Sequence, residues 1–197
     1  MNTFRRKKRT NRCSAWVMTR HFMLILVLVF PRGVSADSPA EEYSVKAAFL
    51  FHFAQFIEWP PEAFNGPGSP LTYCTLGQDP FHGALDASLS GKTISDRPLR
   101  VLHLKPSQDL QGCHVLFLGA SEKKSVSAAL TSLNGKPVLT VGETEHFVEE
   151  GGVIGFSLEE NKIRFEINLD AAERAKLKIS SRLLSLAKQI IGATKVK

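Results

Sequence analysis

Three short, continuous apolar segments constrain the fold of this chain more than any other feature. They cover residues 71–76, 114–118 and 138–141, and polar or turn-forming residues flank each of them. Apolar runs of this length are typical of strands that are buried on both faces, as the strands of parallel sheets are. A further strand is predicted at 99–104. Helical segments separate these strands, and this alternation indicates an α/β domain.

The pattern changes after Gly151-Gly152, where apolar and polar residues begin to alternate. The alternating apolar residues are Ile154, Phe156, Leu158, Ile163, Phe165 and Ile167. Arg164 and Glu166 fall on the opposite face. Alternation with period two predicts an antiparallel hairpin with one solvent-exposed face. The whole pattern therefore predicts a single three-layer α/β domain: a mixed sheet with parallel core strands, an antiparallel edge hairpin and helices on both faces.

Helices are expected between capping and turn residues. They lie at about 41–58, 80–89, 121–133, 170–176 and 181–191, with a short helical stretch at 144–150. The first is apolar over much of its circumference and carries Phe49, Phe53 and Phe56 on one stripe. Such a helix is either buried on several sides or presents part of itself to a partner. We expect these three phenylalanines to form a self-association or regulatory interface, because a surplus of exposed aromatic area usually marks a binding surface.

Residues 1–36 have the organisation of a secretory signal peptide. Clustered basic residues precede an apolar segment at 22–30, and the small residues of Val34-Ser35-Ala36 follow it. The apolar segment is about half as long as the ~20 residues that a membrane-spanning helix needs. We therefore predict a signal peptide at 1–36, cleavage after Ala36 and one mature domain at 37–197 in the periplasm.

The positive net charge of the whole chain comes from this leader. Of 25 Lys and Arg residues, eight lie in the leader, which contains no acidic residue. The predicted mature domain is left with 17 basic and 19 acidic residues, a formal net charge of −2. None of its segments interleaves aromatic residues with clustered Lys and Arg. We therefore expect no nucleic-acid partner.

Two cysteines remain in the predicted mature domain, Cys74 and Cys113. An even number of cysteines in an oxidising compartment favours a disulfide. One alternative is a pair of buried free thiols, which pack like small apolar residues. Another is a zinc site that also uses His82 and His114. Because a disulfide accounts for both thiols, we expect a disulfide and neither a metal nor a cofactor.

The predicted mature domain has no local signature of a catalytic site. Its histidines lack the spacing of helical metal ligands, and neither Cys-x-x-Cys nor Gly-x-Ser-x-Gly occurs. Gly91-Lys92-Thr93 resembles the end of a phosphate-binding loop, but Asp86 stands where that loop needs a glycine. The Ser-x-x-Lys sequences at 121–124 and 185–188 lack the order and companion motifs of penicillin-interacting enzymes. We expect no enzymatic activity.

Several segments resemble the YfiR family, and they occur in the order found in that family. They are EYSVKAAFL at 42–50 with Phe53, Ile57 and EWP at 58–60, CTLG at 74–77, DPF at 79–81, RPL at 97–99, CHVLF at 113–117, GGVIGF at 151–156, IRFEIN at 163–168 and LKISSRLL at 177–184. The resemblance runs from about residue 41 to residue 187 and implies a non-enzymatic periplasmic regulator. The best-understood members bind the periplasmic part of an inner-membrane diguanylate cyclase of the YfiN type and hold it inactive. An outer-membrane OmpA-like lipoprotein of the YfiB type can sequester them.

This resemblance implies a repressor that lowers cyclic di-GMP and hence biofilm or exopolysaccharide output. The alternative is a periplasmic ligand-binding accessory protein of another membrane sensor, either a histidine kinase or a receptor. A homodimer is compatible with both functions. Some relatives carry extra cysteines near the Gly-Gly strand, whereas this chain has no cysteine after Cys113, which argues against a second disulfide.

The residues that carry the resemblance mainly suit structural roles. They include Trp59, Arg97, Gly151, Gly152, Phe156, Phe165, Asn168, Leu183 and Leu184. Paired glycines allow backbone turns that other residues disfavour, so Gly151-Gly152 is expected to form a turn before a strand. Asn168 is expected to satisfy backbone groups where the hairpin leaves the sheet.

Overall fold

The computed structural model describes residues 39–192. The predicted signal peptide at 1–36, its cleavage site and the start of the predicted mature domain lie outside these residues. Within 39–192, no helix combines the length and the apolar character that crossing a membrane requires.

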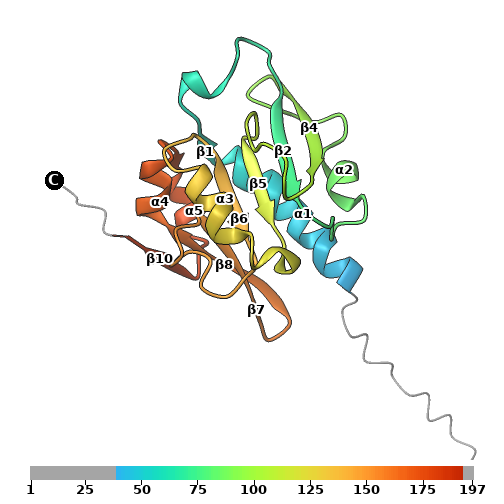
Figure 1. The fold of residues 1–197 in the computed structure, drawn as a ribbon, viewed down its shortest axis with the longest axis vertical. Helices are drawn as coiled ribbons and strands as arrows, with labels where there is room; N and C mark the ends of the chain where they lie inside the picture. Colours follow the sequence, from blue (N-terminus) through green and yellow to red (C-terminus); the bar gives the residue numbers. More distant parts are fainter. Residues whose placement is uncertain (1–38, 193–197) are drawn as a thin grey trace, which may run out of the picture. The chain divides into compact units, whose positions relative to one another are not determined.

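A mixed sheet of eight strands forms the centre of the domain (Figure 1). Its strand order is β10-β8-β7-β6-β5-β2-β4-β3. The strands β4, β2, β5, β6 and β7 run parallel to one another, whereas β8 is antiparallel to β7 and β3 is antiparallel to β4. The strands of this sheet are β2 (Leu71–Leu76), β3 (Thr93–Ile94), β4 (Arg97–Leu104), β5 (Val115–Leu118), β6 (Leu139–Gly142), β7 (Ile154–Glu159), β8 (Lys162–Asn168) and β10 (Gln189–Ile191). A separate antiparallel pair joins β1 (Ile57–Glu58) to β9 (Lys178–Ile179).

Helices pack on both faces of the sheet. They are α1 (Pro39–Gln55), α2 (Ala84–Leu89), α3 (Val126–Ser132), α4 (Leu169–Arg174) and α5 (Ser181–Leu184), with 3-10 turns η1 (Pro61–Ala63) and η2 (Ala120–Glu122). Along β5, Val115 and Phe117 join the apolar core that includes α1 and α2, whereas Leu116 and Leu118 join the core that includes α3. A strand buried on both faces has no polar side, which explains its continuous apolar sequence. The predicted α/β architecture is confirmed.

The last part of the chain differs from the prediction. The helix expected at 181–191 is wrong, because α5 ends at Leu184 and the residues Gln189–Ile191 form β10. This strand pairs in parallel with β8, whose outer edge would otherwise lack backbone partners. Ile190 and Ile191 are β-branched and suit a strand. The hairpin of β7 and β8 is antiparallel as predicted, but β10 rather than β8 forms the edge of the sheet.

The helical stretch expected at 144–150 is instead a series of turns. Backbone hydrogen bonds join Phe147 N to Thr144 O (3.2 Å) and Glu150 N to His146 O (2.9 Å). The φ angle of His146 is 61°. That left-handed conformation interrupts a right-handed helix.

Phe147, within these turns, explains the glycines at positions 142 and 152. Its ring is almost fully buried. A Cβ atom would lie 2.3 Å from the ring at Gly142 and 2.1 Å from it at Gly152, far closer than a van der Waals contact. Gly151 has a φ angle of 104°, in the region that favours glycine. The two paired glycines therefore serve different purposes: one shapes the turn and the other makes room for a core ring.

Asn168 joins the end of the hairpin to α4. Its Nδ2 donates a hydrogen bond to Val148 O (2.6 Å), and its Oδ1 accepts one from Ala171 N (2.9 Å). The second bond is an N-cap, which satisfies a backbone N–H that the first turn of a helix leaves without a partner. Other residues of the family resemblance lie in or against the apolar core: Phe156, Phe165 and Leu183 are buried, and Trp59 and Leu184 are partly buried.

Arg97 holds the loop that precedes β2. Its Nη1 donates hydrogen bonds to the carbonyl oxygens of Gly66 (2.9 Å) and Ser69 (3.0 Å). The guanidinium lies 3.7 Å from the centroid of the Phe64 ring, and that ring stacks on His114 at a centroid separation of 4.6 Å. The hydrogen bonds of Arg97 and the stacked rings of Phe64 and His114 therefore hold this loop in place.

His114 is buried in its neutral form. Its Nδ1 accepts a hydrogen bond from Thr72 N (3.1 Å), so the proton is on Nε2, which lies 3.1 Å from Ala63 O and donates to it. Burial lowers the pKa of His114 from its ordinary value of 6.5, and the nearby Arg97 and Arg100 act in the same direction. The unfolded chain therefore binds a proton more readily than the folded protein does.

We predict that this histidine makes stability depend on pH. Its contribution is complete above the unfolded-state pKa and decreases as the pH falls through that value. The free energy of unfolding should fall more steeply from about pH 7 to about pH 5 in the wild type than in His114→Gln. Urea titrations at several pH values measure this slope. The exposed His52→Gln variant is the control and should keep the wild-type slope, whereas equal slopes for wild type and His114→Gln would contradict the prediction.

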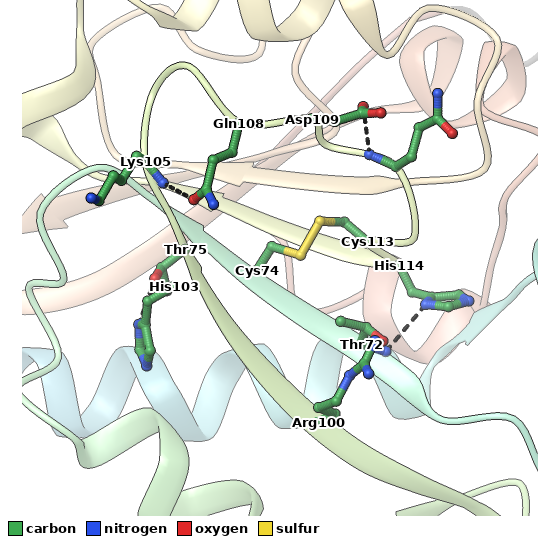
Figure 2. The surroundings of a disulfide bond; sticks show 11 residues. Thr72, Cys74, Thr75, Arg100, His103, Lys105, Gln108, Asp109, Cys113 and His114 are labelled. Carbon is green, nitrogen blue, oxygen red and sulfur yellow. Dashed lines mark hydrogen bonds between the residues drawn. A yellow bond between two sulfur atoms is a disulfide. The ribbon is translucent and has the colours of Figure 1, made fainter.

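A disulfide joins strand β2 to the segment that leads into the neighbouring strand β5 (Figure 2). Cys74 lies on β2 and Cys113 lies just before β5, with their Cα atoms 5.8 Å apart and a sequence separation of 39. Both cysteines belong to the apolar core that includes α3. The pairing expected from the cysteine count is thus present in the structure.

Removing this cross-link should destabilise the fold without changing it. A disulfide that closes a loop of this length contributes about 2–4 kcal/mol, mainly by constraining the unfolded chain. The Cys74→Ala/Cys113→Ala variant should therefore lose roughly that amount in a denaturant titration. A reducing agent should destabilise the wild type and leave the double variant unchanged. Two alkylatable thiols in native protein purified without a reductant would show that the bond does not form.

A candidate site at the carboxyl end of the sheet

The order of strands reverses at β2 and places a candidate site at the carboxyl end of the sheet. From β2 the chain first adds β4 on one side and later adds β5 on the other. In open α/β sheets, ligands bind beyond the carboxyl ends of the strands at such a switch point. The segments that follow β2, β5 and β6 begin here with Gly77, Gly119 and Glu143.

Glu143 is the centre of a buried polar network at this end of the sheet. Its Oε1 accepts hydrogen bonds from the Tyr43 hydroxyl (2.8 Å) and from Ala120 N (2.8 Å). Its Oε2 forms an ion pair with Lys46 Nζ. The side chains of Lys46 and Glu143 are only 7% and 5% exposed. Helix α1 thus supplies two of the groups that bind this carboxylate, and the segment after β5 supplies the third.

Lys46 is paired on two sides. Besides Glu143, it contacts Glu42 Oε1 at 2.5 Å, one helical turn earlier on α1. Its Nζ also lies 4.6 Å from the centroid of the Tyr43 ring. A buried charge needs such partners, and removing one member of a buried ion pair typically costs about 3–5 kcal/mol. Burial, together with the hydrogen bond and charge of Glu143, raises the pKa of Tyr43 well above its usual range, so the hydroxyl remains a proton donor.

Two cavities adjoin this network. One of about 560 Å³ lies over the segment after β6 and the strand β7, and its lining includes Glu145, Phe147 and Phe156. The other, of about 370 Å³, lies at the switch point, and its lining includes Asp79 and Ser121. Both cavities are also lined by Tyr43, Ala120 and Glu143. The Glu143 carboxylate therefore lies where the two cavities meet.

A third hollow, of about 440 Å³, lies between the outer face of α1 and the β7–β8 hairpin. We name it the α1–hairpin groove; its lining residues are Glu41, Glu42, Val45, Phe49, Leu158, Asn161, Lys162 and Ile163. Val45 and Leu158, two large apolar side chains in this lining, are 43% and 56% exposed. An apolar surface with charged residues at its margin resembles a protein interface.

The three phenylalanines predicted as an interface do not share one exposed surface. Phe53 is 1% exposed, and its ring packs on Phe156 and Phe165 at centroid distances of 5.6 and 4.9 Å. Phe53 is therefore a core residue, and the prediction that it lies at an exposed interface is wrong. Phe49 is partly buried and lines the α1–hairpin groove. Phe56 lies beyond the end of α1, with the Arg182 guanidinium 5.7 Å from its ring centroid.

One arrangement in the structure resembles a catalytic triad in its residue types. Thr75 Oγ1 lies 2.9 Å from His103 Nδ1, and His103 Nε2 lies 3.3 Å from Asp86 Oδ2. Thr75 is completely buried, so its hydroxyl cannot reach a substrate. Within residues 39–192, no group of three or more His, Cys, Asp or Glu residues is placed to hold a metal ion.

Tyr43, Lys46 and Glu143 were not predicted as site residues. Two signals for them are present in the sequence. Lys46 interrupts the apolar surface of the first helix, next to Ala47 and Leu50. Glu143 follows a buried strand almost directly, at the edge where ligand sites of α/β domains lie.

A family model described as YfiR/HmsC-like (DUF4154) matches residues 43–188. Because this match covers most of the chain, the protein belongs to the YfiR/HmsC-like family. It is a family of periplasmic, non-enzymatic regulators of cyclic di-GMP signalling.

Two solved structures resemble the domain. A conserved domain protein from Vibrio cholerae O1 biovar El Tor has a TM-score of 0.51 and 12% identity, over 76% of this chain and 60% of the Vibrio chain. An ABC domain in complex with L-Trp from Streptococcus pneumoniae has a TM-score of 0.47 and 10% identity, over 61% of this chain and 55% of the other. The chain thus spans less than two thirds of either protein. The Vibrio structure shows a shared α/β fold and, at 12% identity, nothing of function.

Proposed function

We propose that this protein binds the periplasmic part of an inner-membrane diguanylate cyclase of the YfiN type and holds the cyclase inactive. It would thereby lower cyclic di-GMP and the output of biofilm or exopolysaccharide. The observation that carries this proposal is the family match over residues 43–188. The signal peptide predicted at 1–36 supports it, because export would deliver the domain to the periplasm.

The α1–hairpin groove is the surface that best fits such a partner. Its centre is apolar, and exposed Val45 and Leu158 lie beside partly buried Phe49 and Ile163. Removing this apolar surface from water favours association. Glu42 and Lys162 provide charges of both signs in the lining, which favour one orientation of a partner. This groove contains only Phe49 of the three phenylalanines predicted as the interface.

The floor of the groove is held in place by the core. The Phe49 ring packs on Phe156 and Phe165 at centroid distances of 6.0 and 5.9 Å. Leu158 and Ile163 are cross-strand partners in the hairpin. A surface fixed in this way loses little conformational entropy when a partner binds. The groove is therefore suited to a folded partner domain.

Partners other than a cyclase could also bind this groove, and experiment must distinguish them from the cyclase. An OmpA-like lipoprotein of the YfiB type or a second copy of this chain would compete for the same apolar surface. A ligand-binding accessory protein of a histidine kinase or receptor is the second candidate function. The cavity of about 560 Å³ at the carboxyl end of the sheet favours it, because α/β domains bind small molecules there.

We predict that deletion of the gene raises cellular cyclic di-GMP and that a single substitution in the groove prevents complementation. Wild-type protein should restore the low level, whereas Leu158→Glu should not, because it places a charge in an apolar contact. Leu186→Glu is the matched control: Leu186 is 64% exposed and lies outside the groove. It should complement like the wild type. Cyclic di-GMP is measured by mass spectrometry, with immunoblots to confirm equal amounts of each variant.

Two results would contradict parts of this proposal. Unchanged cyclic di-GMP after deletion, in a strain that expresses the protein, would argue against repression and favour the accessory function. Full complementation by Leu158→Glu would leave repression intact and place the interface elsewhere. A melting temperature of Leu158→Glu close to that of the wild type excludes misfolding as the cause of failure.

A further inference from the structure

Glu143 borders the region in which α/β domains of this topology bind their ligands. The residue directly follows β6, at the carboxyl end of the parallel strands. The cavity at the β2–β5 switch point borders it. Ligands of such domains bind at this end of the sheet, and backbone N–H groups often contact their acidic parts. Here the Ala120 N–H donates to a carboxylate that belongs to the protein itself.

Both oxygens of the Glu143 carboxylate have polar partners. Oε1 accepts hydrogen bonds from Tyr43 Oη and Ala120 N, each at 2.8 Å, and Oε2 receives the Lys46 ammonium. These groups supply one hydroxyl, one amide and one cation. A carboxylate accepts several hydrogen bonds at once, and bonds to an ionised acceptor are the strongest in proteins. The arrangement therefore supplies donors to both oxygens of a carboxylate.

The site is enclosed but remains next to open space. The Glu143 side chain is 5% exposed, and the Lys46 side chain is 7% exposed. Both adjoining cavities, of about 560 and 370 Å³, include Glu143 in their lining. Without the Glu143 side chain, a small molecule would therefore have a path from solvent to the Lys46 ammonium.

We propose that Lys46, Tyr43 and the Ala120 N–H form a carboxylate-binding site, and that Glu143 is its resident ligand. A free monocarboxylate binds the same site once the Glu143 side chain is removed. In the wild type, the tether gives Glu143 a high effective concentration, so a free acid does not displace it. The site links the segment after β6 to α1 and to the segment after β5, across sequence separations of 97, 100 and 23 residues.

Chemical rescue tests this site. Glu143→Ala should melt roughly 10 °C below the wild type, because it leaves Lys46 buried beside only one carboxylate. Sodium acetate at roughly 0.1 M and about pH 7.5 should then raise the melting temperature of the variant by about 4 °C relative to equal sodium chloride. Acetamide, which has the same shape without the charge, should have no effect. The wild type should show no difference between acetate and chloride.

Two further variants distinguish a specific site from a general effect of salt. Glu143→Gln keeps the volume of the side chain, so it should be destabilised and should not respond to acetate. Lys46→Met/Glu143→Ala lacks the cation and should not respond either. Equal acetate responses in Glu143→Ala and in the double variant, or no acetate response in folded Glu143→Ala, would overturn the proposal. If Glu143→Ala does not fold in chloride, refolding in acetate alone supports the site, and failure in both buffers contradicts it.

Discussion

The packing of α1 across the sheet is the contact on which the rest of this structure depends. Leu50, Phe53 and Ala54 are almost completely buried on its inner face. The Phe53 ring lies against Phe156 and Phe165, which belong to the hairpin about a hundred residues later in the chain. Fully burying one such side chain contributes about 1.5–3 kcal/mol. Helix α1 therefore covers one face of the sheet and packs against the β7–β8 hairpin.

Apolar packing does not by itself determine the position of α1 along its own axis, because the hydrophobic effect is non-directional. The polar network supplies that direction: Tyr43 and Lys46 on α1 both bind Glu143 at the carboxyl end of β6. The outer face of the same helix carries Val45 and Phe49, which line the α1–hairpin groove. Residues of α1 thus contribute to the core, to the carboxylate-binding site and to the proposed partner surface. A shift of that helix would alter all three.

Local sequence patterns predicted much of the fold. The apolar run of β5 indicated a strand buried on both faces, and the even cysteine count indicated the Cys74–Cys113 bond. The C-terminal strand β10 was missed because its three residues form a strand only by pairing with β8. The Glu143 network was missed for a similar reason, since the two donors on α1 lie 97 and 100 positions away in sequence. Phe53 was misassigned because an apolar stripe does not reveal which of its rings face the core.

The α1–hairpin groove is the surface that we propose contacts the periplasmic part of a diguanylate cyclase. Hydrogen–deuterium exchange of the purified domain, with and without that part of the cyclase, measures this contact directly. The expectation is slower exchange on binding at the hairpin residues 158–163 and at residues 41–49 of α1, with no change at the distant strands β3 and β4. Binding that slows exchange at β3 and β4 and leaves 158–163 unchanged would contradict it.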